Sequence, residues 1–387
     1  MKDIYDAYID ENIVNNSSFK FNIELGDYKI YDQKESFTCW IFAGFNLIKK
    51  EVAEKIGISE NDFDFSLNYV SFFDRYEKLE LLYDKLIVND YKKEEIKNLL
   101  LDYINTCGNF DSFKYLIRKY GIVFESQMPI CENSYIPNSI NKLLKEKILF
   151  DVEKIYNFKE AKNTKKLLEL KDTMMKENYD ILCEIFGQPP TKCEYKINNK
   201  SAFLTPIEFS KLYINDILNE YKSVISYSTL NYNQTYVMDF NIPNFQKTEY
   251  LNLSKETIKK SILQSLKDKC AVWFGCSYRY MSGSYKNTYG ILHSNLYNFS
   301  KININKLDIN LAEKYDFLNY DHAMLFVGAN VTNNIVDRWK VLNSFGVYNN
   351  KNGYYVMENN FFDENVFLFA IKERYIDYKS LAKKEIN

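Results

Sequence analysis

The sequence predicts an α+β fold in which helices come first and β-strands come last. Apolar residues recur at helical spacing, between caps and stop signals, over much of residues 39–266. From residue 271 onward the chain instead carries short β-favouring runs that turn signals separate. Helices and strands that occupy separate stretches of a chain are typical of α+β proteins.

Each predicted helix has an apolar face and a cap or a stop at one end. Ser66 and Ser254 are suitable N-caps, and Gly57 and Gly121 are suitable stops. Thr205-Pro206-Ile207-Glu208 combines a capping box with a proline in the first helical turn. The predicted helices cover residues 39–55, 67–73, 111–120, 138–186 (one or two helices), 206–218 and 255–266.

The middle of the chain is less regular. Residues 138–186 are rich in Lys and Glu, and because the charges are of both signs we expect solvated amphipathic helices rather than a basic nucleic-acid arm. Gly187-Gln188-Pro189-Pro190 then breaks the chain. Residues 222–250 alternate irregularly, which predicts loops with at most one strand.

The last part of the chain predicts β-strands joined by turns. A hairpin around residues 332–337 would bring Asn343, at the end of one strand, back towards His322 at the start of the preceding one. The predicted strands cover residues 271–276, 323–331, 338–342, 354–357 and 366–371.

Composition excludes several classes of protein. A net charge of −2 over 387 residues argues against a phosphate-tracking surface, so we expect no nucleic-acid partner. No apolar run is long enough to cross a membrane, and residues 1–10 lack the apolar core of a secretory signal. Seven scattered cysteines without a CxxC pair suit a reducing cytoplasm and argue against a zinc site. We therefore expect neither a metal nor another cofactor.

The sequence contains one promising nucleophile. Cys39 stands at the start of a predicted helix, where free N–H groups and the helix dipole stabilise a thiolate. Gln33, six residues upstream, could share an oxyanion with the Cys39 backbone N–H. GxSxG, HExxH, GxxxxGK[ST] and GxGxxG motifs are all missing from the sequence.

A thiolate nucleophile needs an acid–base partner, and the chain has two histidines, His293 and His322. His322 opens an apolar strand, and Asn343 could accept its ring N–H without titrating. We expect Cys39 and His322 to form a thiolate–imidazolium pair. Taken singly, a cysteine at a helix start usually packs as a small hydrophobe, and a histidine before an apolar strand is more often structural.

Together these segments resemble the papain-like cysteine peptidases, specifically the bleomycin hydrolase and aminopeptidase C family. The resemblance covers roughly residues 30–376, in matching order. It rests on Gln33-x5-Cys39-Trp40-Ile41-Phe42-Ala43, Phe65-Ser66-Leu67-Asn68-Tyr69, Lys119-Tyr120-Gly121-Ile122-Val123, Thr205-Pro206-Ile207-Glu208-Phe209, Ala271-Val272-Trp273-Phe274-Gly275-Cys276, His322-Ala323-Met324, Trp339-Lys340-Val341-Leu342-Asn343-Ser344-Phe345-Gly346 and Gly353-Tyr354-Tyr355-Val356-Met357.

The resemblance implies a papain-like, two-lobed fold. A helical lobe (residues 1–125) would carry the nucleophile, and a mainly helical insertion (residues 126–265) would follow. A β-rich lobe (residues 266–387) would carry the histidine and the asparagine. It implies that Cys39, His322, Asn343 and Gln33 are catalytic and that Gly108 and Asn109 bind substrate. Trp40 and Phe345 would support the site. It further implies a cytoplasmic aminopeptidase that acts on peptides as a ring-shaped homo-hexamer.

The sequence departs from that family at several places. Phe345 replaces the tryptophan that shields the hydrogen bond between the asparagine and the histidine, and is still aromatic. Phe37 and Thr38 replace small and basic residues before the nucleophile, which predicts an altered wall of the oxyanion pocket. Cys107 replaces the first glycine of the substrate strip. The tail after Ile376 is short, which predicts relaxed restriction to free N-termini and some endopeptidase action. Two other functions stay open: a degenerate homologue that only binds or has a structural role, and a Cys-His-Asn acyltransferase of the transglutaminase type.

Overall fold

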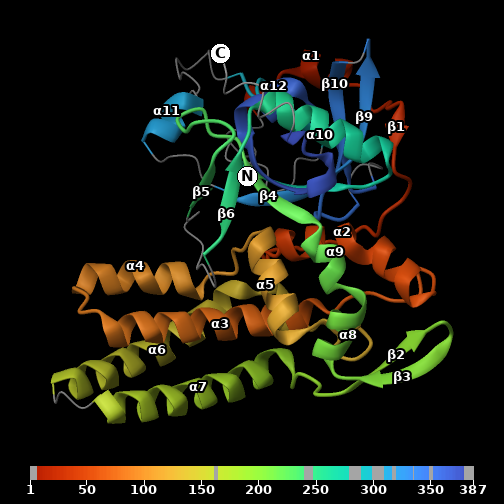
Figure 1. Ribbon diagram of the computed structural model, residues 1–387. Coiled ribbons are helices and arrows are strands. Elements are labelled where there is room, and N and C mark those ends of the chain that lie inside the picture. The colour runs from red at the N-terminus through yellow and green to blue at the C-terminus, as the bar shows by residue number, and fades with distance from the viewer. Residues whose placement is uncertain are drawn as a thin grey trace.

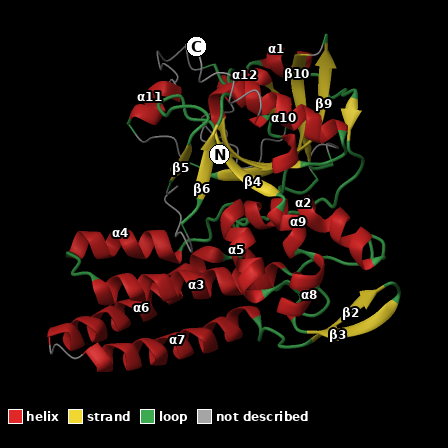
Figure 2. Ribbon diagram, viewed as in Figure 1, coloured by secondary structure: helices red, strands yellow, loops and turns green. Residues whose placement is uncertain are grey.

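The chain forms a lobe of helices and a lobe built on a large sheet (Figure 1). The computed structural model describes residues 7–160, 164–238, 247–278, 289–298, 309–315, 320–333, 335–347 and 352–378. Figure 2 shows that long helices fill one half of the molecule, whereas most strands lie in the other. The predicted α+β class is therefore confirmed. Among the described residues, no helix is long and apolar enough to cross a membrane.

The helical lobe contains most of the first half of the chain. Its long helices are α2 (Cys39–Ile56), α3 (Leu67–Val88), α4 (Lys93–Ile104), α5 (Phe110–Tyr120), α6 (Pro137–Glu160) and α7 (Thr164–Phe186). Short elements are η2 (Glu132–Tyr135), α8 (Pro206–Tyr213), α9 (Asn215–Asn219) and the hairpin of β2 (Cys193–Ile197) and β3 (Lys200–Leu204).

Local signals correctly placed the end of α2 and the starts of α3 and α8, whereas α4 was not predicted and α3 runs 15 residues beyond its predicted end at Phe73. Ser66 accepts a hydrogen bond from the Tyr69 N–H at the start of α3, and Gly57 ends α2 in a left-handed conformation. Thr205 and Glu208 form the predicted capping box of α8. The helix predicted to run to residue 218 is interrupted at Ile214, where α8 ends and α9 begins.

The β-lobe is organised around one mixed sheet. Within the described residues its strands follow the order β5-β6-β4-β12-β7-β9-β10-β11-β8, and β1 pairs with β9. The bounds are β1 (Ile23–Glu24), β4 (Tyr221–Ile225), β5 (Thr235–Val237), β6 (Glu249–Asn252), β7 (Val272–Cys276), β8 (Ile291–Leu292), β9 (His322–Thr332), β10 (Ile335–Leu342), β11 (Tyr354–Glu358) and β12 (Val366–Lys372). Helical elements here are α1 (Glu11–Asn16), α10 (Lys255–Lys267), α11 (Ile309–Lys314), α12 (Asn359–Asn365) and η5 (Glu373–Tyr375).

The prediction of loops with at most one strand over residues 222–250 is wrong. Strands β4 and β5 and the start of β6 lie in this stretch. Strand β4 lies between β12 and β6, and most of its side chains are buried. A strand buried on both faces loses the polar–apolar alternation by which strands are recognised in a sequence. The predicted lobe boundaries stay predictions, although β4 and β6 join the sheet of the last lobe.

The sheet is covered on both faces, and this explains the apolar sequence of β9. Ala323, Leu325 and Val327 belong to the core shared with the helical lobe. Met324 and Phe326 point into a second core that includes residues of α10 and α12. Alternate side chains of a strand point to opposite faces. A central strand between two cores is therefore apolar throughout.

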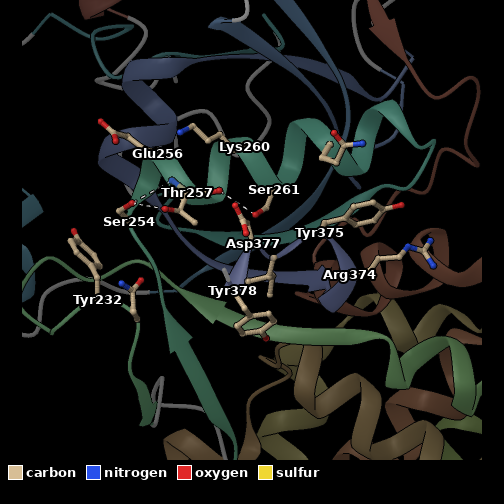
Figure 3. Close-up of a pocket in the computed structure, with 13 residues that line it drawn as sticks. Tyr232, Ser254, Glu256, Thr257, Lys260, Ser261, Arg374, Tyr375, Asp377 and Tyr378 are labelled. Carbon is tan, nitrogen blue, oxygen red and sulfur yellow. Dashed lines mark hydrogen bonds between the residues drawn. The ribbon is translucent and has the colours of Figure 1, made fainter. Parts of the chain in front are cut away.

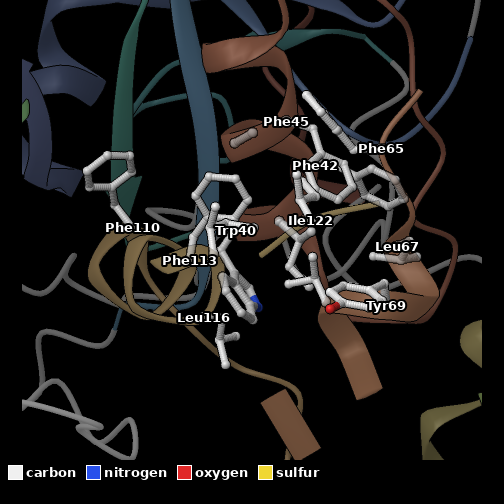
Figure 4. Packing of buried hydrophobic residues seen from close by; sticks show 14 of the residues in the cluster. Trp40, Phe42, Phe45, Phe65, Leu67, Tyr69, Phe110, Phe113, Leu116 and Ile122 are labelled. Carbon is white, nitrogen blue, oxygen red and sulfur yellow. The ribbon is translucent and has the colours of Figure 1, made fainter. Parts of the chain in front are cut away.

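Aromatic packing fixes the start of α2 within the first core. Figure 4 shows Trp40, Phe42 and Phe45 of α2 among side chains from α3 and α5, including Phe113. The Phe45 and Phe113 rings are 5.9 Å apart and meet edge to face. A side chain at Gly44 would collide with the Phe113 ring at 2.9 Å. This close contact sets the position of the helix that begins at Cys39.

Gly121 offers a test of how the end of α5 meets α8. Its φ of +81° and ψ of −163° suit only glycine, and an added Cβ would lie 2.1 Å from the Pro206 carbonyl carbon. We expect Gly121→Ala to lower the free energy of unfolding by about 3 kcal/mol or more. Gly187→Ala is the control, because Gly187 has φ +89° but no atom within 4 Å of the added Cβ. It should cost only about 1–2 kcal/mol. Equal costs in urea unfolding would contradict the packing argument.

Candidate active site

Cys39 lies at the N-terminus of α2, as predicted. It is the first residue of an 18-residue helix and is only 5% exposed. The preceding residue, Thr38, makes no side-chain capping hydrogen bond. The first N–H groups of α2 and the positive end of its dipole are therefore next to the sulfur.

The thiol of Cys39 also contacts the β-lobe. Burial raises the pKa of Cys39 to about 12, while hydrogen bonds from the backbone N–H groups of Ala323 and Trp40 oppose the rise. The nearby carboxylate of Asp321 adds to it. Ala323 directly follows His322 in β9, so the fold brings the two predicted catalytic residues to one place.

His322 and Asn343 are joined by the predicted hydrogen bond. The distance from His322 Nε2 to Asn343 Oδ1 is 2.8 Å, and both residues are buried. The Ser344 backbone N–H donates to the same Oδ1 at 2.7 Å, which identifies that atom as the acceptor oxygen. Nε2 must therefore carry a proton. In the neutral ring, Nδ1 is then the basic nitrogen.

Burial opposes charge on both members of the predicted thiolate–imidazolium pair. Burial lowers the pKa of His322 to about 4, and the hydrogen bond to Asn343 only partly opposes this. Burial raises the pKa of Cys39 in the same site. Desolvation disfavours the charged form of both groups. Burial alone therefore favours a thiol and a neutral imidazole, and the thiolate–imidazolium pair stays a prediction.

Two aromatic rings cover His322. The Phe345 ring stacks on the imidazole with centroids 4.8 Å apart and an interplanar angle of 26°. Tyr278 is the last described residue before a gap. Its ring also packs on the imidazole, with centroids 4.9 Å apart. These rings exclude water from the His322–Asn343 hydrogen bond, as the resemblance implies for Phe345.

Gln33 is held beside the asparagine segment. It is 3% exposed, and its Oε1 accepts a hydrogen bond from Ser344 Oγ at 2.6 Å. Within the described part of the chain, its Nε2 has no hydrogen-bond partner. The bond from Ser344 fixes which end of the amide is the oxygen, so Nε2 is the free donor.

The residues before α5 form a strip beside the nucleophile. Trp40 Nε1 donates to the Thr106 carbonyl oxygen at 2.9 Å. The buried ammonium of Lys78 donates to the carbonyl oxygens of Asn105 (3.1 Å) and Cys107 (2.7 Å). These bonds hold the strip against the helical lobe.

The two predicted substrate-binding residues differ in their surroundings. Gly108 packs against the ring of Trp40, and the side chain of Asn109 makes hydrogen bonds within the protein. A Cβ at Gly108 would lie 2.4 Å from the Trp40 ring, so this approach requires glycine. Asn109 is 1% exposed, caps α5 by accepting from the Ser112 N–H at 2.9 Å, and donates to Tyr250 Oη. Any substrate contact of Asn109 would therefore come from its backbone.

Phe37, the bulky replacement before the nucleophile, has a left-handed backbone with φ of +57°. Such a conformation is uncommon for a large side chain. Phe37 is 43% exposed, whereas Ser36 and Thr38 on either side of it are buried, with their hydroxyl oxygens 2.5 Å apart. An unusual backbone therefore accommodates a large residue in the loop that leads to Cys39.

A cavity of about 760 Å³ lies elsewhere, between α10 and the segment after β12 (Figure 3). Lys260 and Arg374 line it together with Glu256 and Asp377. It contains none of the predicted site residues and no cysteine or histidine. We therefore place the chemistry at Cys39. No group of three or more His, Cys, Asp or Glu side chains in the described ranges could hold a metal ion.

Comparisons with known proteins agree with this architecture. The Peptidase C1-like family matches residues 1–387. Aminopeptidase C of Listeria innocua is 31% identical over 92% of this chain and 82% of its own length. Bleomycin hydrolase of Mus musculus is 26% identical over the same shares. The crystal structure of PepW from Lactobacillus rhamnosis HN001 superposes with a TM-score of 0.86 and 28% identity, and covers 99% of this chain and 89% of the other.

The fold and the family match define a papain-like cysteine peptidase, and the predicted two-lobed fold is confirmed. The chain belongs to the Peptidase C1-like family. Its relatives are named aminopeptidase C, aminopeptidase E and bleomycin hydrolase, so it is a cysteine-type peptidase.

Sequence reasoning missed three neighbours of the site. Ser344 bonds to Gln33, Tyr278 covers His322, and Tyr320 bonds to the strip through its hydroxyl. Ser344 and Tyr320 lie within two residues of predicted catalytic residues. Proximity in the sequence was therefore a usable signal for both. Tyr278 follows the recognised segment that ends at Cys276.

The lowered pKa of His322 predicts a pH dependence of stability. Because its pKa is about 4 in the folded protein and about 6.5 in an unfolded chain, the unfolded state binds the proton first as the pH falls. The free energy of unfolding should drop by about 3 kcal/mol from this group between pH 6.5 and pH 4. The contribution of His322 is the free energy of unfolding of the wild type minus that of His322→Gln, measured in urea at each pH. If this difference instead grows as the pH falls to 6.5, the folded protein stabilises the imidazolium.

Proposed function

We propose that the chain is a cytoplasmic cysteine aminopeptidase that hydrolyses peptides through Cys39, His322 and Asn343, with Gln33 as an oxyanion donor. The observation that carries the proposal is the 2.8 Å bond between His322 and Asn343 beside the segment that contacts the Cys39 thiol. The relatives named aminopeptidase C support the substrate class.

The first half of the proposed reaction forms an acyl-enzyme. Cys39 Sγ attacks the scissile carbonyl carbon while the thiol proton moves to His322 Nδ1. A tetrahedral oxyanion forms, and Gln33 Nε2 and the Cys39 N–H donate to it. The C–N bond then breaks, and His322 passes its proton to the leaving amine. A thioester between the substrate and Cys39 remains.

The second half regenerates the enzyme. His322 Nδ1 takes a proton from water, whose oxygen attacks the thioester carbonyl. The C–S bond breaks, the carboxylic acid leaves, and the sulfur recovers a proton from the imidazolium. Throughout, Asn343 accepts from Nε2–H and keeps the ring in one orientation. A neutral resting pair suits this scheme, because the proton transfer accompanies attack instead of preceding it.

The compartment and the assembly belong to the same proposal. All seven cysteines are free, which suits a reducing cytoplasm. A homo-oligomeric ring is proposed by family resemblance, and its size can be measured by light scattering.

Substitution of the acid–base pair tests the function. We expect Cys39→Ala and His322→Ala each to abolish hydrolysis of aminoacyl coumarin amides, because each removes a group that makes or breaks a bond. His293→Ala is the matched control and should stay near wild-type activity. Full activity of His322→Ala with loss in His293→Ala would contradict the assignment.

Iodoacetamide labelling read by mass separates a peptidase, which labels at Cys39, from a degenerate binding homologue, which does not. An acyltransferase would label but transfer the acyl group to an added amine instead of water.

Gln33 and Ser344 provide a graded test of the oxyanion site. Gln33→Ala removes a donor and should lower kcat by about 10²–10³-fold. Ser344→Ala leaves the donor but frees its orientation, so we expect a loss of about tenfold or less. Rescue by Ser344→Thr, which restores a hydroxyl, would support a positioning role. Equal losses for Gln33→Ala and Ser344→Ala, or no loss for Gln33→Ala, would contradict this arrangement.

A further inference from the structure

Tyr320 connects the two sides of the site. It precedes His322 by two residues, and its hydroxyl donates to the Gly108 carbonyl oxygen at 2.8 Å. One residue comes from the β-lobe and the other from the strip that Trp40 and Lys78 hold on the helical lobe. The phenol therefore crosses between the catalytic histidine segment and the predicted substrate-binding strip.

The Tyr320 ring fills a notch that a glycine creates. A Cβ at Gly275 would lie 2.5 Å from the ring, and Trp273 packs against it with centroids 6.2 Å apart. Gly275 pairs with Ala323 in the sheet, and the Ala323 N–H contacts the Cys39 thiol. The ring thus occupies the space directly beside the nucleophile.

This position interferes with the binding of a long acyl segment. An extended peptide that places a carbonyl at Cys39 directs its next amide N–H and side chain along the strip. The Gly108 carbonyl oxygen would be the acceptor for that amide, but Tyr320 already uses it. A second residue would also need the volume that the ring takes above Gly275. A second residue before the scissile bond would therefore have to displace Tyr320.

We propose that Tyr320 is a specificity-determining residue that limits the acyl side of the cleft to a single amino acid with a free α-amino group. The proposal rests on the peptidase function proposed above and deepens it. It assigns the aminopeptidase restriction to a residue beside the nucleophile rather than to the C-terminal tail. That tail, from residue 379, lies outside the described residues.

The neighbouring charge suits a substrate ammonium group. Asp321 is exposed, and its Oδ1 accepts from the Tyr278 N–H, which holds the carboxylate beside the site. It lies near enough to Cys39 and Cys107 to raise the pKa of both thiols, after the larger effect of burial. The Tyr320 oxygen donates to Gly108 and keeps lone pairs that can accept from an N–H donor. A free amino terminus carries a positive charge and N–H donors that match this carboxylate and this acceptor. An acetylated terminus has no charge and only one N–H.

The test compares two substrates that share one scissile bond. One is X-aminomethylcoumarin, where X is the residue that the wild type cleaves best. The other is acetyl-Leu-X-aminomethylcoumarin. We expect wild-type kcat/KM for the second to be at least about a hundredfold lower. Tyr320→Ala removes the ring and should raise the ratio of the second to the first by at least about tenfold. Tyr320→Phe frees only the Gly108 oxygen and should raise it by about three- to tenfold.

Tyr195→Phe is the matched control. The Tyr195 hydroxyl donates to the Ile122 carbonyl oxygen, also at 2.8 Å, in the helical lobe. It should leave the ratio unchanged. Since Tyr320→Phe keeps the ring, it preserves the test if Tyr320→Ala does not fold.

Two failures can be told apart. Equal cleavage of both substrates by the wild type, or an unchanged ratio in the Tyr320 variants, would overturn the role of Tyr320 and leave the peptidase intact. If neither substrate is cleaved and iodoacetamide does not label Cys39, the peptidase function itself fails, and this inference fails with it.

Discussion

A short antiparallel pairing between two distant segments holds the site together. The Gln33 N–H donates to the Ser344 carbonyl oxygen at 2.7 Å, and the Gly346 N–H donates to the Tyr31 carbonyl oxygen at 2.9 Å. Gly346 has φ of +71°, and a Cβ there would lie 3.1 Å from Asp32, so glycine lets the strands approach. This pairing places Gln33, the proposed oxyanion donor, next to Ser344. Because α2 begins at Cys39, six residues after Gln33, the pairing also fixes the position of the proposed nucleophile.

Burial determines how that site must work. Water exclusion by Phe345 and Tyr278 strengthens the hydrogen bond between His322 and Asn343 but disfavours charge on the imidazole. The same burial disfavours a thiolate on Cys39, despite the helix dipole and two backbone donors. Under the proposed mechanism, the arrangement is preorganised for charge that develops during attack. Charge separation becomes favourable when a substrate carbonyl offers the oxyanion that the free donors can bind.

Local signals predicted what local interactions decide. The cap at Ser66, the stop at Gly57 and the box at Thr205 each depend on residues a few positions apart, and each lies where the sequence placed it. Strand β4 escaped prediction because its burial depends on β6 and β12, which lie elsewhere in the chain. The contact of Tyr320 with Gly108 spans 212 residues and has no local pattern. The same holds for Ser344 and Gln33, which are 311 residues apart.

The bonds that hold the strip differ in how easily they can be exchanged. Lys78 is fully buried between Asp74 and two strip carbonyls, so losing these partners would leave a buried charge unpaired. Trp40 is 1% exposed and packs against the strip itself. Tyr320 alone among these three comes from the β-lobe, and it is only partly buried, so loss of its hydrogen bond leaves no buried charge unpaired. The helical lobe therefore fixes the shape of the strip, while the hydroxyl of Tyr320 bonds to it from the β-lobe.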